Sequence, residues 1–316
     1  MIYWGINSFN HGSSLAVINS ESKNDLPFFK TSTEDRLPRE LITNALHIGT
    51  PKRIFWYERP LVKKIRQLYA GQYSSAADFS DMPATFINQE GFSWVPVSYT
   101  PHHASHAAAG YYTSPFDQCA VVVIDAIGEF ECATIWEGKN NKLRKVWSRN
   151  YPNSLGLFYS AFTKLIGLEP LKQEYLLQEM AEHGDPTRYY STVKEYVNNI
   201  VCLTRNLHKG VYDWPHVIVP AEDHNDIAAA VQLVFEEQIE LIMDKARELT
   251  GSNCLVYMGG CAMNSKANAA VVKKWDYVWS LANPGDPSSS IGAVLYHTKH
   301  RLHQKLDPVK HIEIRI

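Results

Sequence analysis

Short apolar blocks alternate with polar turns along the first hundred positions of the chain, a pattern typical of strands joined by tight turns. The opening IYWGINSFNHGSSLAVIN predicts a strand, a polar turn containing glycine, and a second strand. PFFKTSTE predicts a third strand, PRELITNALHIG has helical spacing with a glycine stop, and RIFWYE predicts a short buried strand. Residues 61–90 have helical spacing at first and become irregular later.

A second cycle with the same order of elements begins near residue 95. WVPVSYT predicts a strand, and residues 101–112 predict a helix. CAVVVIDAIGEFECATIWEG then repeats the opening pattern of strand, glycine turn and strand. KLRKVWSRN follows through the hairpin turn GKNN as a third strand. The two cycles repeat in pattern and not in sequence.

The remaining chain is helical over much of residues 156–249 and ends in a further α/β portion. The repeated pattern predicts two related α/β lobes with mixed sheets that face a central cleft. This is the form of the actin–sugar-kinase-like (ASKHA) fold. We expect the first lobe in residues 1–95 and the second in residues 96–316, with the C-terminal helix packing back on the first lobe.

Composition narrows the classes of function. The chain has 316 residues and a formal net charge of −2, so a dedicated binder of duplex nucleic acid is not expected, while a single nucleotide remains open as a substrate. No apolar run approaches the ~20 residues of a membrane-spanning helix, and MIYWGINSF does not have the form of a signal peptide. The five cysteines include no Cys-x-x-Cys pair, so we expect a cytoplasmic protein without a zinc ribbon.

Three histidines cluster at the start of the helix predicted after residue 100. We expect Thr100 to be its N-cap and Pro101 to take the first helical position. His102 and His106 are four residues apart, so their Cβ atoms lie roughly 5–6 Å apart on one face and both imidazoles can bind one metal ion. His103 points away from that face and is a candidate contact for a substrate. The alanines around them keep the helix slim, which allows close packing.

Two carboxylates complete a candidate metal site. VVVID ends an apolar strand with Asp125, where a carboxylate is costly unless it has a partner. ANPGDPSSSIGAVLY places Asp286 in a loop just before a helix. Two histidines and two carboxylates suit iron(II), manganese or zinc. Taken singly, Asp125 is explained as a strand-end turn residue and Asp286 as an N-cap, so the prediction depends on all four residues together.

Glycine-containing turns lie at three predicted strand ends. LVYMGGCAMNSKANAAV has a strand, the pair Gly259-Gly260 and a helix whose free N–H groups suit an anion. His11, in the turn NHGSS, is a candidate general acid–base or phosphate ligand. DAIGEFE is the matching turn of the second lobe. These turns suit a nucleotide between two lobes, whereas the Walker and Gly-x-Gly-x-x-Gly motifs are absent from the sequence.

Together these segments resemble the N-terminal domain of the O-carbamoyltransferases of nodulation-factor and antibiotic type. That domain is similar to the catalytic protein of threonylcarbamoyl-adenosine tRNA modification. The resemblance covers most of the chain and rests on the order and spacing of GINSFNHGSSLAV, EDR, PHHASHAAAGYYTSPF, VVVIDAIGE, NSLGLFYSAFTKLIGL, DIAAAVQ, MGGCAMNSKAN and NPGDPSSSIGAVLY.

The resemblance implies a metal site, commonly iron, at His102, His106, Asp125 and Asp286. The metal would hold the phosphate of a carbamoyl-adenylate, which is formed from carbamoyl phosphate and ATP. It further implies that His11 takes the proton from the hydroxyl group of the acceptor.

The resemblance also implies where the nucleotide binds. Gly259, Gly260 and Asn264 match the adenylate-binding segment, and Gly156 and Ser160 match a helix edge beside it. Two segments depart from the family pattern: HGSS replaces His-Asp-Ala-Ser, and MAEHGDP replaces Leu-Ala-Pro-Tyr-Gly. The domain that makes carbamoyl-adenylate in typical members has no counterpart here. The donor would come from a separate protein, from this chain alone, or from a longer product that includes this chain.

Three functions remain open. The first is a metal-dependent O-carbamoyltransferase that acts on a sugar, an antibiotic or a 5-hydroxymethyl pyrimidine nucleotide such as hydroxymethyl-dCMP. The second is a tRNA threonylcarbamoyl transferase, which the near-neutral charge fits poorly. The third is a non-catalytic subunit of a two-protein carbamoyltransferase, against which the full set of four ligand residues argues. We favour the first.

Other charged residues have simpler interpretations. The cluster PKRIFWYERPLVKKIRQLY either lines an entrance for an acceptor or is a solvated helix face, and we favour the solvated face. Arg36 and Arg39 are expected in surface salt bridges. Glu129 either supports the Asp125 turn or faces solvent, and the sequence favours neither.

Overall fold

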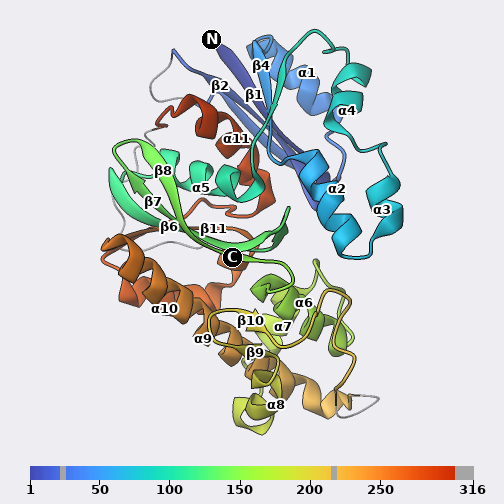
Figure 1. Cartoon of the computed structure of the whole chain (residues 1–316), viewed down its shortest axis with the longest axis vertical. Coiled ribbons are helices and arrows are strands. Elements are labelled where there is room, and N and C mark those ends of the chain that lie inside the picture. Colours follow the sequence, from blue (N-terminus) through green and yellow to red (C-terminus); the bar gives the residue numbers. More distant parts are fainter. Residues whose placement is uncertain (22–25, 215–218, 303–316) are drawn as a thin grey trace.

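The computed structural model describes residues 1–21, 26–214 and 219–302 (Figure 1). Two five-stranded mixed sheets form its frame. The first sheet has the order β3-β2-β1-β4-β5 and the second has the order β8-β7-β6-β11-β12. In each sheet three strands form an antiparallel meander and two more add in parallel. The predicted repeat of the strand pattern is therefore confirmed as a repeat of topology.

The strands of the first sheet are β1 (Ile2–Asn10), β2 (Gly12–Asn19), β3 (Phe28–Ser32), β4 (Arg53–Trp56) and β5 (Val97–Tyr99). Those of the second sheet are β6 (Gln118–Gly128), β7 (Glu131–Lys139), β8 (Lys142–Asn150), β11 (Cys254–Met258) and β12 (Tyr277–Trp279). A small ribbon joins β9 (Val197–Asn198) to β10 (Cys202–Leu203). Because β5 pairs with β4, the expected lobe boundary after residue 95 falls one strand before the end of the first sheet.

The helices are α1 (Arg39–Ile48), α2 (Pro60–Tyr69), α3 (Tyr73–Ala77), α4 (Pro83–Gln89), α5 (His102–Thr113), α6 (Leu155–Leu165), α7 (Glu174–Met180), α8 (Tyr190–Lys194), α9 (His224–Thr250), α10 (Ser265–Lys274) and α11 (Ser289–Thr298). Within the described part of the chain, no helix has the length and apolar character needed to cross a membrane.

Two helices lie between the sheets. α11 packs on β1 of the first sheet, α5 packs on β6 and β11 of the second, and the two helices pack on each other (Figure 1). One apolar core fills this central space, and a second core lies between the other face of the second sheet and the helices α6 and α9. The C-terminal helix α11 therefore contacts the first sheet.

Strand β6 shows why one apolar run serves both cores. Successive strand residues point to opposite faces, so Ala120, Val122 and Ile124 enter the outer core while Val121 and Val123 face α5. A strand buried on both faces reads as a continuous hydrophobic run. The next odd-numbered position is residue 125, so its side chain is aimed toward the central pair of helices.

Small residues allow the two central helices to approach closely. A Cβ at Gly292 of α11 would collide with the carbonyl oxygen of Ser105 in α5, and a Cβ at Gly5 of β1 would collide with the carbonyl oxygen of Ser290. Ala104 and Ala108 of α5 are fully buried in the same core. The expectation of a slim histidine helix is confirmed.

The expected cap of that helix is wrong. α5 begins at His102 with Pro101 as its N-cap residue and with no side-chain cap. The hydroxyl of Thr100 donates to the carbonyl oxygen of Ala293, 3.3 Å away, and lies 3.1 Å from Nε2 of His297. The Thr100 side chain, which local propensity assigns to the N-cap, is therefore used in the packing against α11 instead.

The solvated face expected for the basic cluster is also wrong. Helix α2 buries Lys64 and Arg66, while Leu61, Ile65 and Leu68 are exposed. The amphipathic pattern is present, but the polar face packs inward. There Lys64 donates to the carbonyl oxygen of Ser75 and Arg66 donates to the side chain of Gln72, both in the α3 segment that follows α2.

Replacing Gly292 with alanine tests the close helix contact. We expect Gly292→Ala to lower the free energy of unfolding by at least about 2 kcal/mol, because the new methyl group must push α11 away from α5. Gly91→Ala is the control, since a Cβ there meets nothing within 4 Å and pays only for a positive φ of 85°. Urea denaturation of both variants measures the difference; equal losses would contradict the contact.

Candidate metal centre and nucleotide cleft

Four side chains that are far apart in the sequence converge between the sheets. Nε2 of His102 and Nε2 of His106 lie 3.1 Å apart. Nε2 of His106 lies 3.2 Å from Oδ1 of Asp286 and 3.3 Å from Oδ2 of Asp125. One ligand atom from each residue falls within 4.8 Å of the others. The structure thus brings together the four residues expected to bind a metal.

Each ligand is positioned by the fold described above. The histidines lie on the first turns of α5, and Asp125 continues the register of β6 that faces this helix. Asp286 opens a short 3₁₀ turn, Asp286–Ser288, that leads directly into α11. The close packing of α5 against α11 therefore sets the distance between the histidines and Asp286.

The donor set fits a divalent transition metal. Two imidazole nitrogens and two carboxylates are borderline and hard ligands of the kind that iron(II), manganese and zinc accept. The imidazoles are buried, whereas the side chains of Asp125 and Asp286 are 14% and 13% exposed. A bound ion would thus be reached by a ligand from the side of the carboxylates.

The metal-free cluster is held by its own charges. Burial acts to lower the pKa values of His102 and His106, but the carboxylates of Asp125 and Asp286 outweigh it, and both pKa values lie above the ordinary one. Burial acts to raise the pKa values of Asp125 and Asp286, but the two histidines outweigh it and hold both below the usual range. Protonated imidazoles thus balance the carboxylates when no metal is bound.

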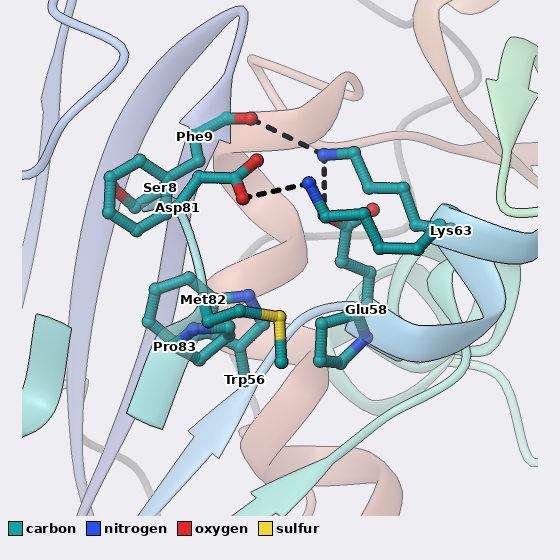
Figure 2. Close-up of a pocket in the computed structure, with 10 residues that line it drawn as sticks. Ser8, Phe9, Trp56, Glu58, Lys63, Asp81, Met82 and Pro83 are labelled. Atoms are coloured by element: carbon teal, nitrogen blue, oxygen red, sulfur yellow. Dashed lines mark hydrogen bonds and ion pairs between the residues drawn. The ribbon is translucent and has the colours of Figure 1, made fainter. Parts of the chain in front are cut away.

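A second group of residues surrounds these ligands, and sequence reasoning missed it. The amide of Asn10 donates to Oδ2 of Asp286. The buried carboxylate of Glu58 lies 3.9 Å from Nδ1 of His102 and accepts a 2.7 Å hydrogen bond from Lys63. Figure 2 shows Lys63 between Glu58 and the carbonyl oxygen of Phe9. The sequence signal that could have found both residues is their position at strand ends: Asn10 ends β1, and Glu58 follows β4 by two residues.

The other two predicted histidines lie apart from the cluster. His103 is fully buried, and its Nδ1 lies 3.0 Å from the hydroxyl of Thr134. Burial and the neighbouring His102 hold the pKa of His103 well below the ordinary value. This burial does not fit the substrate contact expected from its helical position. His11 is exposed at the β1–β2 turn, directly after Asn10.

The glycines predicted to bind the nucleotide pack against the end of β6. A Cβ at Gly156 would lie 2.7 Å from the Cα of Ala126, and one at Gly260 would lie 3.0 Å from Oδ1 of Asp125. Gly259 has φ +95°, and a Cβ there would collide with the carbonyl oxygen of Ile124. These glycines bring the starts of α6 and of the segment before α10 close to the candidate metal ligand.

The two polar residues predicted beside the nucleotide have protein partners. Asn264 caps α10 by accepting a 3.0 Å hydrogen bond from the N–H of Ala267, and it exchanges two 3.0 Å amide hydrogen bonds with Gln232. The hydroxyl of Ser160 donates to Glu174 at 2.7 Å. The amide pair joins the start of α10 to α9, and the Ser160 bond joins α6 to α7; these helices lie below the second sheet (Figure 1).

Glu129 does not face solvent, and its hydrogen-bond partner is Arg59. It is buried at the β6–β7 turn, and it accepts hydrogen bonds from the backbone N–H of Arg59 at 2.7 Å and from the guanidinium of the same residue. The bond joins the start of α2 to the second sheet. Arg36 and Arg39 form the expected surface salt bridges, both with Glu90.

The overall fold has solved counterparts. The activator of the 2-hydroxyisocaproyl-CoA dehydratase from Clostridium difficile, solved with bound ADPNP, aligns over 94% of both chains with a TM-score of 0.52 and 14% identity. HypF of T. kodakarensis aligns over 94% of this chain and 48% of its own, with a TM-score of 0.52 and 12% identity. The chain has the two-lobed ASKHA fold of these proteins, as expected.

The sequence defines the family. The profile described as carbamoyltransferase N-terminus matches residues 67–295, which is more than half of the chain. The chain belongs to this family of carbamoyltransferases.

Individual relatives agree with this assignment. An uncharacterised protein of Synechocystis is 31% identical in an alignment of 223 residues that covers 63% of this chain and 36% of the relative. Nodulation protein NolNO of Sinorhizobium fredii is 24% identical in an alignment of 214 residues that covers 63% of this chain and 31% of the relative. The chain spans about a third of the length of the curated relatives that it matches.

The pKa shifts predict how stability depends on pH. The raised pKa values of His102 and His106 stabilise the metal-free protein fully below about pH 6.5, and this contribution is lost as the pH rises through the raised values. The lowered pKa values of Asp125 and Asp286 contribute stability above about pH 4 that is lost on acidification. The Tm of the metal-free protein should therefore fall from pH 6 to pH 9, as measured by calorimetry.

Added metal should reverse this trend, because it binds deprotonated imidazoles and its stabilisation grows with pH. A double variant, His102→Gln with His106→Gln, should lose both effects, whereas His47→Gln at the exposed end of α1 should keep them. A metal-free Tm that rises between pH 6 and pH 8 would contradict the assignment.

Proposed function

We propose that the chain is a metal-dependent O-carbamoyltransferase that moves a carbamoyl group from carbamoyl-adenylate to a hydroxyl acceptor. The observation that carries this proposal is the convergence of two histidines and two carboxylates beside the glycine turn at Gly259-Gly260. Membership of the carbamoyltransferase N-terminus family supports the reaction class. Two solved proteins of similar fold, the dehydratase activator with ADPNP and a full-length HypF with phosphate and nucleotide, have these ligands bound, which supports an adenylate between the lobes.

The chemistry follows from the residues. Carbamoyl-adenylate is a mixed anhydride, so attack by a hydroxyl oxygen on the carbamoyl carbon forms the new ester bond and releases AMP. A metal bound at His102, His106, Asp125 and Asp286 would stabilise the charge that develops on the leaving phosphate. Asn10 donates a hydrogen bond to Asp286, and the carboxylate of Glu58 lies 3.9 Å from Nδ1 of His102. His11 is exposed beside Asn10 and is our candidate for the group that accepts the proton of the hydroxyl.

The source of the donor and the identity of the acceptor are parts of the proposal. Carbamoyl-adenylate forms from carbamoyl phosphate and ATP, either on this chain or on a separate protein. The nodulation proteins among the relatives favour a small-molecule acceptor, with sugars and 5-hydroxymethyl pyrimidine nucleotides as the candidate classes. We assign the two lobes to residues 1–95 and 96–316, with β5 completing the sheet of the first lobe, and the space between the lobes to the nucleotide.

Product mass analysis tests the function. The purified chain, loaded with iron(II), is incubated with hydroxymethyl-dCMP or aminoglycoside sugars and with either synthetic carbamoyl-adenylate or the pair ATP and carbamoyl phosphate. We expect a carbamoyl mass gain on one acceptor with the synthetic donor. Transfer with ATP and carbamoyl phosphate as well would show that the chain makes its own donor. No transfer from carbamoyl-adenylate to any acceptor would favour a non-catalytic subunit.

A ligand variant tests the metal centre in the same assay. Asp286→Asn should lower the transfer rate by at least about 100-fold, because it removes a ligand and one of the two carboxylates that balance the paired imidazoles. Asp244→Asn is the matched control on the exposed side of α9, and it should retain full activity. Metal content measured by elemental analysis should fall only in Asp286→Asn. Equal activity of the two variants would contradict a catalytic metal.

A further inference from the structure

Helix α2 places several cations inside the protein, and most of them have an anionic partner. Lys63 pairs with Glu58 at 2.7 Å (Figure 2). Lys64 pairs with Asp81 at 2.9 Å. Arg59, just before the helix, pairs with Glu129. Each of these charges is therefore explained by the fold.

Arg66 is different. Its side chain is 8% exposed, yet within the described ranges it forms no ion pair with a carboxylate. Its Nη1 donates a 2.6 Å hydrogen bond to the neutral amide oxygen of Gln72, and its Nε is buried without a hydrogen-bond partner among the described residues. A guanidinium does not give up its proton in proteins, so this charge stays in place.

Burying such a charge is costly unless an anion accompanies it. Desolvation on burial lowers the pKa of Arg66, which reports the same cost. The unbonded Nε and the absence of a carboxylate partner leave the guanidinium with unused capacity to bind an oxyanion, for which its planar donors are well suited.

The groups next to Arg66 extend this donor-rich region into the second lobe. Nε2 of Gln72 lies 3.5 Å from Nε2 of His208, which is at the long limit of hydrogen bonding. Nδ1 of His208 lies 3.0 Å from the hydroxyl of Tyr151, to which Asn206 also donates at 3.0 Å. Arg66 and Gln72 come from the first lobe, and the other three come from the second. None of these partners is a carboxylate.

This polar chain lies close to the candidate metal centre. Tyr151 belongs to a small buried cluster against which Ala126 and Ile127 pack, and these two residues directly follow Asp125. Ala70, at the end of α2, packs on the same cluster. An anion held by Arg66 would therefore lie at the contact of the two lobes, separate from the four metal ligands.

We propose that Arg66, Gln72, His208 and Tyr151 form an oxyanion subsite that binds a phosphate monoester group of the hydroxyl acceptor. The inference rests on the proposed function, in which the metal cluster already takes the phosphate of the donor, so a second anion subsite is left for the acceptor. The long Gln72–His208 contact is the point at which the oxyanion enters. The acceptor class is accordingly a phosphorylated hydroxyl compound, such as a hydroxymethyl pyrimidine 5′-monophosphate, in preference to an uncharged sugar.

Calorimetric titration of the full chain with hydroxymethyl-dCMP, hydroxymethyl-deoxycytidine and inorganic phosphate tests the subsite without requiring turnover. Arg66→Gln should weaken binding of the nucleotide about 10- to 100-fold and leave the nucleoside unchanged. Gln72→Glu is the sharper variant, because it places a carboxylate against Nη1 and fills the subsite from within. We expect it to keep or raise the Tm while losing phosphate and nucleotide binding. Arg144→Gln, at an exposed surface pair, is the control.

Two further results separate the possible sources of the phosphate. Hydroxymethyl-dCMP binding should survive in Asp286→Asn, and AMP binding should survive in Gln72→Glu. AMP binding lost in Gln72→Glu would assign the subsite to the donor and overturn the proposal. Equal binding of hydroxymethyl-dCMP to Gln72→Glu and to the unaltered chain would also overturn it. A chain that binds as expected and transfers no carbamoyl group would contradict the proposed function alone.

Discussion

The contact between α5 and α11 is the constraint on which the candidate site depends. A glycine in α11 faces a backbone carbonyl of α5, and a glycine in β1 faces a backbone carbonyl of α11, so the helix is fixed between its neighbours without intervening side chains. His102 and His106 lie on α5, and Asp286 lies just before α11. Because protein interiors transmit small displacements, any widening of this contact would separate the ligands.

The charges at the centre explain how four ionisable groups are tolerated between two apolar cores. Each imidazole is stabilised in its protonated form by two carboxylates, and each carboxylate by two imidazoles. The opposite charges thus balance before a metal arrives, while Nδ1 of His102 and Nδ1 of His106 stay buried without a hydrogen-bond partner among the described residues. A metal ion would replace the protons in the same role.

Helix α2 ties the first lobe to this centre. Just before the helix, Arg59 pairs with Glu129 and Glu58 lies beside His102, both in the second lobe. Within the helix, the side chains of Lys63 and Arg66 point inward. The opposite face of the helix, with Leu61, Ile65 and Leu68, is exposed to solvent. Through its inward polar face, α2 contributes to the contact between the lobes, to the surroundings of a metal ligand and to the proposed acceptor subsite.

The sequence by itself determined the strand pattern of both lobes and the four candidate ligands. Helical spacing of four residues, a carboxylate at the end of a buried strand and an aspartate before a helix are local patterns that mark the four residues. Their convergence at one point depends on the packing of α5 against α11. The tertiary structure alone decided which face of α2 is buried, that Thr100 bonds to α11, that His103 is enclosed, and that Asn10 and Glu58 reach the ligands. An amphipathic pattern fixes that a helix has two faces, but the neighbours that it meets in the folded chain decide which of them points inward.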